Sequence, residues 1–275
     1  MDNIPLLVTV DENYLYPLHI MLTSLSLNNP GETFSLYIMH REIPGSGLEA
    51  VAKHCEAIGC RMISVQVDDS CFHGAPTMKQ YPAEMYYRLL APLLLSSNLS
   101  RILYLDPDIL VINPIRPLWE TDMKGNLFAA ASHQGKTELI NGVNQVRLGT
   151  DSKYYNSGVL LIDLERGRKE IISKQIFEYV NEHGKGLLLP DQDILNALYG
   201  DRILELDDAL WNYDARNYST YLLLSAGVYD IDWVVSHTSI LHFCGKSKPW
   251  QLGYLHRFGI LYKHYQQLTR RDRYI

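Results

Sequence analysis

Short apolar runs alternate with helical patterns over about the first 110 residues, and this alternation constrains the fold more than any other feature. The apolar runs lie at residues 4–10, 34–39, 61–67 and 102–105, and helical patterns at 17–27, 47–58 and 82–95 separate them. Strands that alternate with helices every roughly 25–30 residues form βαβ units and a parallel sheet. The sequence therefore predicts an α/β protein with a doubly wound sheet.

Several element boundaries can be predicted as well. The helix at 47–58 follows Pro44-Gly45-Ser46, should begin with a capping box formed by Ser46 and Glu49, and should end at Gly59. The second half is less regular: strands are expected at 127–131, 159–163 and 203–206, and a short apolar run lies at 240–244. Helices are expected at 168–181 and 194–199, and loops at 133–154 and, in the first half, at 68–81. Asp191 is expected to act as the N-cap of the helix at 194–199.

Two carboxylates, Asp106 and Asp108, follow the apolar run at 102–105 and precede a β-branched run at 109–112. A buried carboxylate is unfavourable unless it is paired or bound to a metal, and a divalent cation relieves the repulsion between two of them. In a regular strand the two positions would stand about 6.6 Å apart, so one shared ion requires a turn, a water or converging side chains. Pro107 favours the turn. The alternative is a strand-ending turn with two solvated aspartates.

The acidic residues share one edge of the predicted sheet. Asp11 follows the first strand, and Asp106 and Asp108 follow the fourth. In open α/β sheets, ligands bind beyond the carboxyl ends of the strands, so this edge is the expected binding site. The chain contains neither G-x-G-x-x-G nor G-x-x-x-x-G-K-[ST], which argues against a dinucleotide dehydrogenase and a P-loop ATPase.

Composition favours one large domain, residues 1–250, with an aromatic and basic helical tail at 251–275. The net charge of −6 argues against a nucleic-acid partner. The tail has two interpretations, an amphipathic helix that touches anionic lipid or a solvated helix packed on the domain. The sequence shows no signal peptide, no membrane-spanning stretch and no C-x-x-C pair, so we expect a cytoplasmic protein with reduced thiols, with peripheral attachment at the inner face of the membrane as an alternative.

Six short stretches, in order along nearly the whole chain, carry a family resemblance. They are VDENY (10–14), YYR (86–88), YLDPDILV (104–111), YNSGVLLIDL (155–164), PDQDILN (190–196) and HFCGKSKPW (242–250). The chain thus resembles the retaining glycosyltransferases of family 8, which include bacterial lipopolysaccharide galactosyl- and glucosyltransferases and the glycogenins. The resemblance implies a GT-A fold, with a Rossmann-like nucleotide-binding sheet and a mixed acceptor-side half. It also implies Mn²⁺ with Mg²⁺ as an alternative, a UDP-sugar donor, and retention at the anomeric carbon.

The resemblance assigns a metal site and a nucleotide site. Asp106, Asp108 and His242 would hold the cation, and two oxygens with one nitrogen suit Mn²⁺ better than Ca²⁺. Taken alone, His242 would be read as a buried, hydrogen-bonded histidine. The uridine-binding residues would be Asp11, Asn13 and Tyr14, and the diphosphate-binding residues Gly245 and Lys248. A polar turn at 11–14 and a basic loop at 245–248 are the alternatives.

Donor-sugar contacts fall on Arg88, Asn156, Asp191 and Gln192 in the same resemblance. Each has an ordinary alternative: a solvated helix charge for Arg88, a turn residue for Asn156 and a helix cap for Asp191. Arg88 can form a fork with a carboxylate, and Asp191 is the suggested partner. Gln192 is expected under the anomeric carbon, but an amide is a weak nucleophile. We therefore favour front-face attack, with Asp191 as the carboxylate to test for double displacement.

The sequence leaves the substrates open. The segment 133–154, which should border the acceptor, matches no family stretch, and the site residues suit glucose and galactose alike. The leading hypothesis is transfer of a hexose from a UDP-sugar to a saccharide or glycolipid acceptor. A metal-dependent nucleotide-sugar hydrolase and a non-catalytic UDP-sugar-binding protein are the alternatives.

Overall fold

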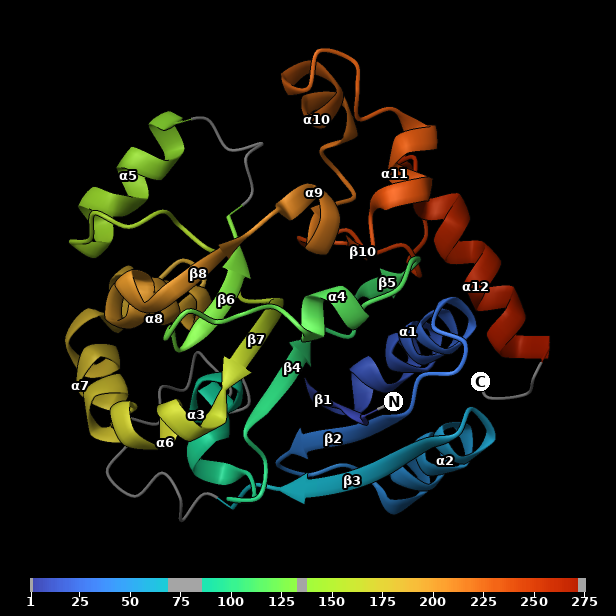
Figure 1. Cartoon of the computed structure of the whole chain (residues 1–275), viewed down its shortest axis with the longest axis horizontal. Helices are drawn as coiled ribbons and strands as arrows, with labels where there is room; N and C mark the ends of the chain where they lie inside the picture. Colours follow the sequence, from blue (N-terminus) through green and yellow to red (C-terminus); the bar gives the residue numbers. More distant parts are fainter. Residues whose placement is uncertain (1, 69–85, 133–137, 272–275) are drawn as a thin grey trace.

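The computed structural model describes residues 2–68, 86–132 and 138–271, and a seven-stranded sheet forms its centre (Figure 1). The strands are β1 (Ile4–Thr9), β2 (Phe34–His40), β3 (Cys60–Gln66), β4 (Arg101–Leu105), β6 (Phe128–Ala131), β7 (Val159–Asp163) and β8 (Ile203–Leu206). Their order is β3-β2-β1-β4-β7-β6-β8. The β3-β2-β1-β4 half is parallel, whereas β7 runs antiparallel to both β4 and β6. The α/β prediction, with a mixed second half, is confirmed.

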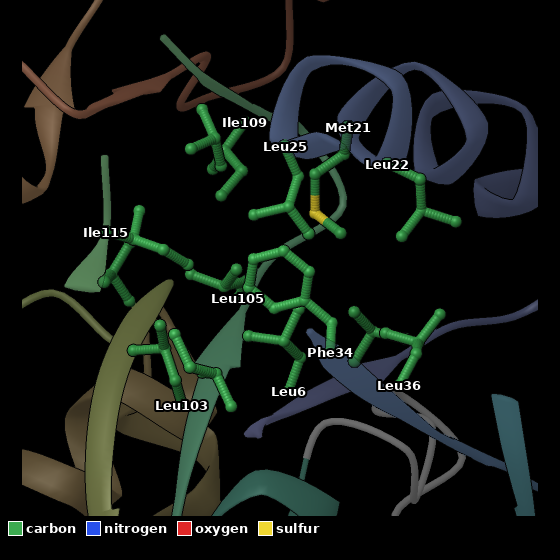
Figure 2. Close-up of a cluster of buried hydrophobic side chains, with 14 of the residues drawn as sticks. Leu6, Met21, Leu22, Leu25, Phe34, Leu36, Leu103, Leu105, Ile109 and Ile115 are labelled. Carbon is green, nitrogen blue, oxygen red and sulfur yellow. The ribbon is translucent and has the colours of Figure 1, made fainter. Parts of the chain in front are cut away.

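Helices cover both faces of this sheet because successive strand residues point to opposite sides. Leu6 and Val8 of β1 pack against one face cluster with α1 (Leu15–Asn28) and α2 (Gly45–Ala57), and Figure 2 shows Leu6 below Met21 and Leu25. Leu7 points the other way, into a cluster built on further helices. These are α3 (Tyr87–Leu94), α6 (Leu164–Glu170), α7 (Ser173–His183) and α8 (Pro190–Tyr199).

A second, three-stranded sheet lies next to the first and positions the histidine of the site. It has the order β5-β10-β9, with β5 (Ile109–Val111), β10 (Ile240–His242) and β9 (Tyr213–Asp214). β10 runs antiparallel to β5, and this register sets His242 opposite Ile109. The backbone N–H of Phe243 donates to the carbonyl of Asp108 at 3.0 Å. Two segments about 130 residues apart in the chain are thereby brought together.

Four further helices form a third cluster around this small sheet. They are α9 (Asp208–Trp211), α10 (Tyr218–Leu224), α11 (Ile231–His237) and α12 (Gly259–Arg271), while α4 (Arg116–Trp119) follows β5. α12 packs on α1, and the hydroxyl of Thr269 donates to that of Thr23 at 2.9 Å. The tail helix is therefore packed on the domain, and its contact with lipid stays a prediction. Among the described residues, none of the helices has both the length and the apolar character needed to cross a bilayer.

The predicted loop at 133–154 is wrong in its described part, which contains the helix α5 (Glu138–Leu148). Among the described side chains of this helix, from residue 143 on, the two valines Val143 and Val146 point outward and are 60% and 86% exposed. The helix is instead attached through a polar contact, since the Arg147 guanidinium forks onto the fully buried Asp193 carboxylate of α8 at 2.7 and 2.8 Å.

Three further boundary predictions are wrong. The helix expected at 168–181 is two helices, α6 and α7, because residues 171 and 172 adopt extended conformations between them. Pro44 and not Ser46 occupies the N-cap of α2, so the predicted capping box does not form. Asp191 lies inside the first turn of α8, whose N-cap is Leu189. The predicted loop at 68–81 and the predicted helix start at 82 fall almost wholly outside the described residues, although α3 itself is present.

Candidate active site

A cavity of about 730 Å³ opens at the carboxyl ends of β1 and β4. It brings together eleven of the twelve residues predicted from the sequence, which are Asp11, Tyr14, Arg88, Asp106, Asp108, Asn156, Asp191, Gln192, His242, Gly245 and Lys248. Asn13 is the exception, because its amide turns back and donates to Asp11 Oδ2 at 3.2 Å. The expected edge of the sheet is therefore where the polar residues meet.

At the centre of the cavity, the two carboxylates and the histidine converge. Asp106 and Asp108 stand in the turn between β4 and β5, and His242 ends β10. One ligand-type atom from each side chain lies within 4.8 Å of the others. His242 Nε2 is 3.3 Å from Asp108 Oδ1 and 3.9 Å from Asp106 Oδ2. The turn that Pro107 favours thus lets side chains two residues apart reach a single point.

These residues fit a divalent cation on two observations besides their chemistry. A Cβ at Gly158 would lie 2.3 Å from His242 Cε1 and 2.8 Å from Asp106 Oδ2, so only glycine leaves these two side chains in their present arrangement. A cationic group already bonds to the cluster, because the Lys248 ammonium donates to Asp108 Oδ2. The set of two oxygens and one nitrogen belongs to the ligands that Mn²⁺ accepts.

The charges around the two carboxylates differ, and so do their pKa shifts. Burial raises the pKa of Asp106, although the Arg88 guanidinium at 3.1 Å opposes that effect. Burial would also raise the pKa of Asp108, but His242 and Lys248 outweigh it and hold that pKa below its usual range. Asp106 additionally accepts a hydrogen bond from the Tyr104 hydroxyl.

The end of the cavity at β1 is built by a short turn. Asp11 caps the 3₁₀ turn Glu12–Tyr14, and its Oδ1 accepts from the backbone N–H of Tyr14 at 3.2 Å. The Tyr14 ring meets Trp250 edge to face, with 6.2 Å between the ring centroids. This end therefore combines a fixed carboxylate with an aromatic ring beside it.

The opposite end of the cavity is organised by Arg88. Its Nη1 lies 3.0 Å from Asp191 Oδ2, so Asp191 is an ion-pair partner as predicted, but the contact is through one nitrogen and is not a fork, and the same nitrogen is close to Asp106. Asp191 Oδ2 also accepts from the Ser157 hydroxyl at 2.8 Å. Gln192, the next residue of α8, is 4% exposed and accepts from the amide of Asn156 at 3.0 Å.

Sequence reasoning missed Ser157 and Arg216, which line this cavity, and the buried Asn212, which bonds to two of the lining side chains. The Arg216 guanidinium forks onto the fully buried Asp214, and a Cβ at Gly245 would lie 2.3 Å from its Nη1. Asn212 bonds to His242 Nδ1 at 2.8 Å. Ser157 lies inside one of the six stretches, which is the signal that could have found it. The segment 211–216 carries no periodic pattern and reaches the site only through the β9–β10 pairing.

Known proteins are similar in sequence to this chain over most of its length. The sequence model of the family described as glycosyl transferase family 8 matches residues 5–252. General stress protein A of Bacillus subtilis (strain 168) is 30% identical over 271 residues, covering 94% of this chain and 92% of that protein. Lipopolysaccharide 1,2-glucosyltransferase of Escherichia coli (strain K12) is 26% identical over 250 residues, covering 88% of this chain and 71% of that protein.

A solved structure extends the likeness to three dimensions. The crystal structure of galactosyltransferase LgtC in complex with donor and acceptor sugar analogues superposes with a TM-score of 0.79 at 23% identity and covers 96% of both chains. At this level of identity the superposition shows a shared fold and nothing further. The predicted GT-A fold is confirmed.

Proposed function

The chain belongs to glycosyl transferase family 8, as the six stretches predicted, and from this membership we propose that it moves glucose or galactose from a UDP-sugar to a saccharide or glycolipid acceptor with retention at the anomeric carbon. One observation carries the proposal: Asp106, Asp108 and His242 meet within 4.8 Å, in a cavity with a carboxylate–aromatic end and a hydrogen-bonding end. A nucleoside diphosphate sugar has matching parts, in the order base, diphosphate and hexose.

Asp106, Asp108 and His242 would hold Mn²⁺, with Mg²⁺ as the alternative. Such an ion, when bound, supplies positive charge against the diphosphate as UDP departs. The protein's own contribution is the rigid arrangement of the three ligands, which Gly158, Tyr104 and Arg88 hold in place.

The uridine would occupy the end built by Asp11 and Tyr14. A carboxylate accepts the N3–H of uracil, which cytosine does not offer, and Tyr14 offers a ring for stacking. Asn13 contributes by donating to Asp11, which holds that carboxylate in position. At the diphosphate, Gly245 has a φ of 84°, a conformation that L side chains rarely adopt, and Lys248 supplies a positive charge.

The hexose would lie against Arg88, Asn156, Asp191 and Gln192. Arg88 stands between Asp106 and Asp191, so the sugar subsite and the cation site share one guanidinium. Asp191 and Gln192 are fixed on the first turn of α8 and therefore have little freedom to move. Their hydrogen-bonding groups suit the hydroxyls of either hexose.

Retention by front-face attack agrees with how these groups are engaged. The Asp191 carboxylate is held by Arg88 and the Ser157 hydroxyl, and an ion-paired carboxylate is a weakened nucleophile. Gln192 offers only an amide. We infer that the acceptor hydroxyl attacks from the side of the departing diphosphate, which takes its proton. The bond from the anomeric carbon to the acceptor oxygen forms as its bond to the UDP oxygen breaks. The hexose passes to the acceptor, and the acceptor proton passes to UDP.

The acceptor class follows from the relatives by analogy. The E. coli relative acts on lipopolysaccharide by its name, and LgtC was crystallised with an acceptor sugar analogue. A saccharide or glycolipid acceptor is the corresponding proposal for this chain.

The proposed activity can be tested by supplying UDP-glucose and UDP-galactose separately with Mn²⁺ and an array of glycan and lipid acceptors. We expect UDP release with a glycosylated product from one donor, and loss of both when EDTA is added. Asp108→Asn, which keeps the shape but removes a ligand charge, should lower the rate by at least about 10²-fold. Release that EDTA leaves unchanged would refute the metal role. Free hexose as the sole product at every acceptor would identify a hydrolase instead.

A further inference from the structure

We propose that Asn212 is a positioning residue that fixes both the metal-facing nitrogen of His242 and the amide of Gln192. The inference rests on the proposed function, because it concerns residues expected to hold the cation and the donor hexose. Asn212 directly follows α9 and is fully buried. It belongs to no stretch that suggested the family.

Asn212 is the second member of a chain of four side chains. Its Oδ1 bonds to His242 Nδ1 at 2.8 Å, and its Nδ2 donates to Asn156 Oδ1 at 2.9 Å. The Asn156 amide nitrogen in turn donates to Gln192 Oε1 at 3.0 Å. The chain of side chains runs from β10 through the residue after α9 and the segment before β7 to α8.

A backbone group determines the direction of this whole chain. The N–H of Gly158 donates to Asn156 Oδ1 at 2.9 Å, and a backbone N–H can only donate. The atom of Asn156 at that point must therefore be the oxygen. Its amide nitrogen then faces Gln192, which has to present its own oxygen in return.

The orientation of Asn156 also determines the orientations of Asn212 and His242. Because the Asn156 oxygen accepts, Asn212 must offer its amide nitrogen there and its oxygen to His242. Nδ1 of His242 consequently carries a hydrogen, and Nε2 is the nitrogen that faces the carboxylates, 3.3 Å from Asp108 Oδ1. In metal sites, the partner of the second ring nitrogen commonly fixes the tautomer and ring orientation of a ligating histidine.

At the other end, the network decides what Gln192 can offer to a sugar. With its oxygen occupied by Asn156, the polar atom that remains for the cavity is the amide nitrogen, a hydrogen-bond donor. Asn212 therefore couples the orientation of a cation ligand to that of a sugar contact. A substitution there should affect metal binding and transfer in ways that depend on its hydrogen-bonding groups.

Two substitutions separate these effects, with Mn²⁺ titrated calorimetrically in the presence of UDP, where no turnover occurs. Asn212→Ala removes both bonds and should weaken Mn²⁺ binding by about 10- to 100-fold. Asn212→Asp keeps an acceptor for His242, so Mn²⁺ affinity should stay within about threefold of wild type. Its second oxygen would face the Asn156 oxygen, so the bond between residues 212 and 156 is lost and Asn156 no longer holds the Gln192 amide. The kcat with the UDP-sugar should therefore fall at least about tenfold.

Asn29→Ala is the matched control, because Asn29 is also buried and also loses two hydrogen bonds, to the Leu25 carbonyl and from the Ile115 N–H. It should lower the thermal midpoint as Asn212→Ala does and leave Mn²⁺ affinity unchanged. Equal Mn²⁺ affinity of Asn212→Ala and Asn29→Ala would overturn the inference. Equal loss in Asn212→Ala and Asn212→Asp, or unchanged kcat in Asn212→Asp, would do the same. If wild type with UDP binds no Mn²⁺, the proposed metal role fails first and takes this inference with it.

Discussion

A methyl group at residue 158 should disable the cation site while leaving the fold intact. In Gly158→Ala the new Cβ would lie 2.3 Å from His242 Cε1, 2.8 Å from Asp106 Oδ2 and 3.0 Å from Asn156 Oδ1. Carbon atoms in ordinary contact are separated by about 3.5 Å, so the histidine ring has to move by about 1 Å. Gly158 does not adopt a positive φ, so alanine strains no backbone torsion and the effect is steric.

The size of this displacement sets the expected loss. Metal–ligand distances tolerate about 0.2 Å, several times less than the required movement. We therefore expect Mn²⁺ affinity in the presence of UDP to fall at least about 100-fold, and kcat/KM by about 10²-fold, the usual effect of a 1 Å misplacement. Overpacking should lower the free energy of unfolding by about 1–3 kcal/mol.

The assay is calorimetric titration of Mn²⁺ into the UDP-saturated protein, followed by initial rates of UDP release. Gly45→Ala is the matched control, because Gly45 begins α2 and a Cβ there meets nothing within 4 Å. The control should bind Mn²⁺ as wild type does. If Gly158→Ala binds Mn²⁺ within about threefold of Gly45→Ala, the assignment of the three ligands is refuted.

Three further predictions concern stability and mechanism. His19 and His54 are buried with Nδ1 atoms 2.8 Å apart, and burial lowers their pKa values to about 4 and about 3. Because these pKa values lie below the unfolded value, the unfolded chain binds more protons as pH falls from about 6.5 toward 4, so each histidine should cost about 2 kcal/mol of unfolding free energy at pH 5. Urea unfolding at pH 7.5 and pH 5 measures this loss. His54→Gln should reduce the difference in unfolding free energy between the two pH values, and an equal difference in both proteins would contradict the prediction. Arg147→Met leaves the buried Asp193 without its guanidinium and should lower the free energy of unfolding by about 3 kcal/mol, with a change under about 0.5 kcal/mol refuting that role. Asp191→Asn should keep anomeric retention at a rate roughly 10²-fold lower, as seen by NMR of the product, whereas a hexose adduct on Asp191 in the wild-type protein, detected by mass spectrometry, would establish double displacement.

The parts of this fold that the sequence predicts well are those encoded locally. The strands at 4–10, 34–39 and 159–163 stand out because buried strands of a sheet covered on both faces read as continuous apolar runs. The binding edge follows from the strand ends alone, which is why the sequence suffices to place Asp11, Asp106 and Asp108 together. Local capping patterns are less dependable, since Ser46 and Asp191 both lie inside their helices.

Features held by contacts distant in sequence could not be predicted in the same way. α5 depends on the ion pair of Arg147 with Asp193, 46 residues away, and its exposed valines hide the helical pattern. Arg216 reaches the cavity, and Asn212 reaches His242, only because β9 pairs with β10, two short strands without a distinctive sequence. His242 could be assigned only through the family resemblance, because its position beside Asp108 results from the β5–β10 register.

The central claim is that one divalent cation binds among Asp106, Asp108 and His242 together with the diphosphate of a UDP-sugar. A crystal structure with Mn²⁺ and UDP, recorded at a wavelength where manganese scatters anomalously, tests it most directly. We expect a single anomalous peak among the three side chains, with Asp oxygens and His242 Nε2 each roughly 2.1 Å from it. An anomalous peak elsewhere, or UDP bound in the cavity with no peak at these residues, would contradict it.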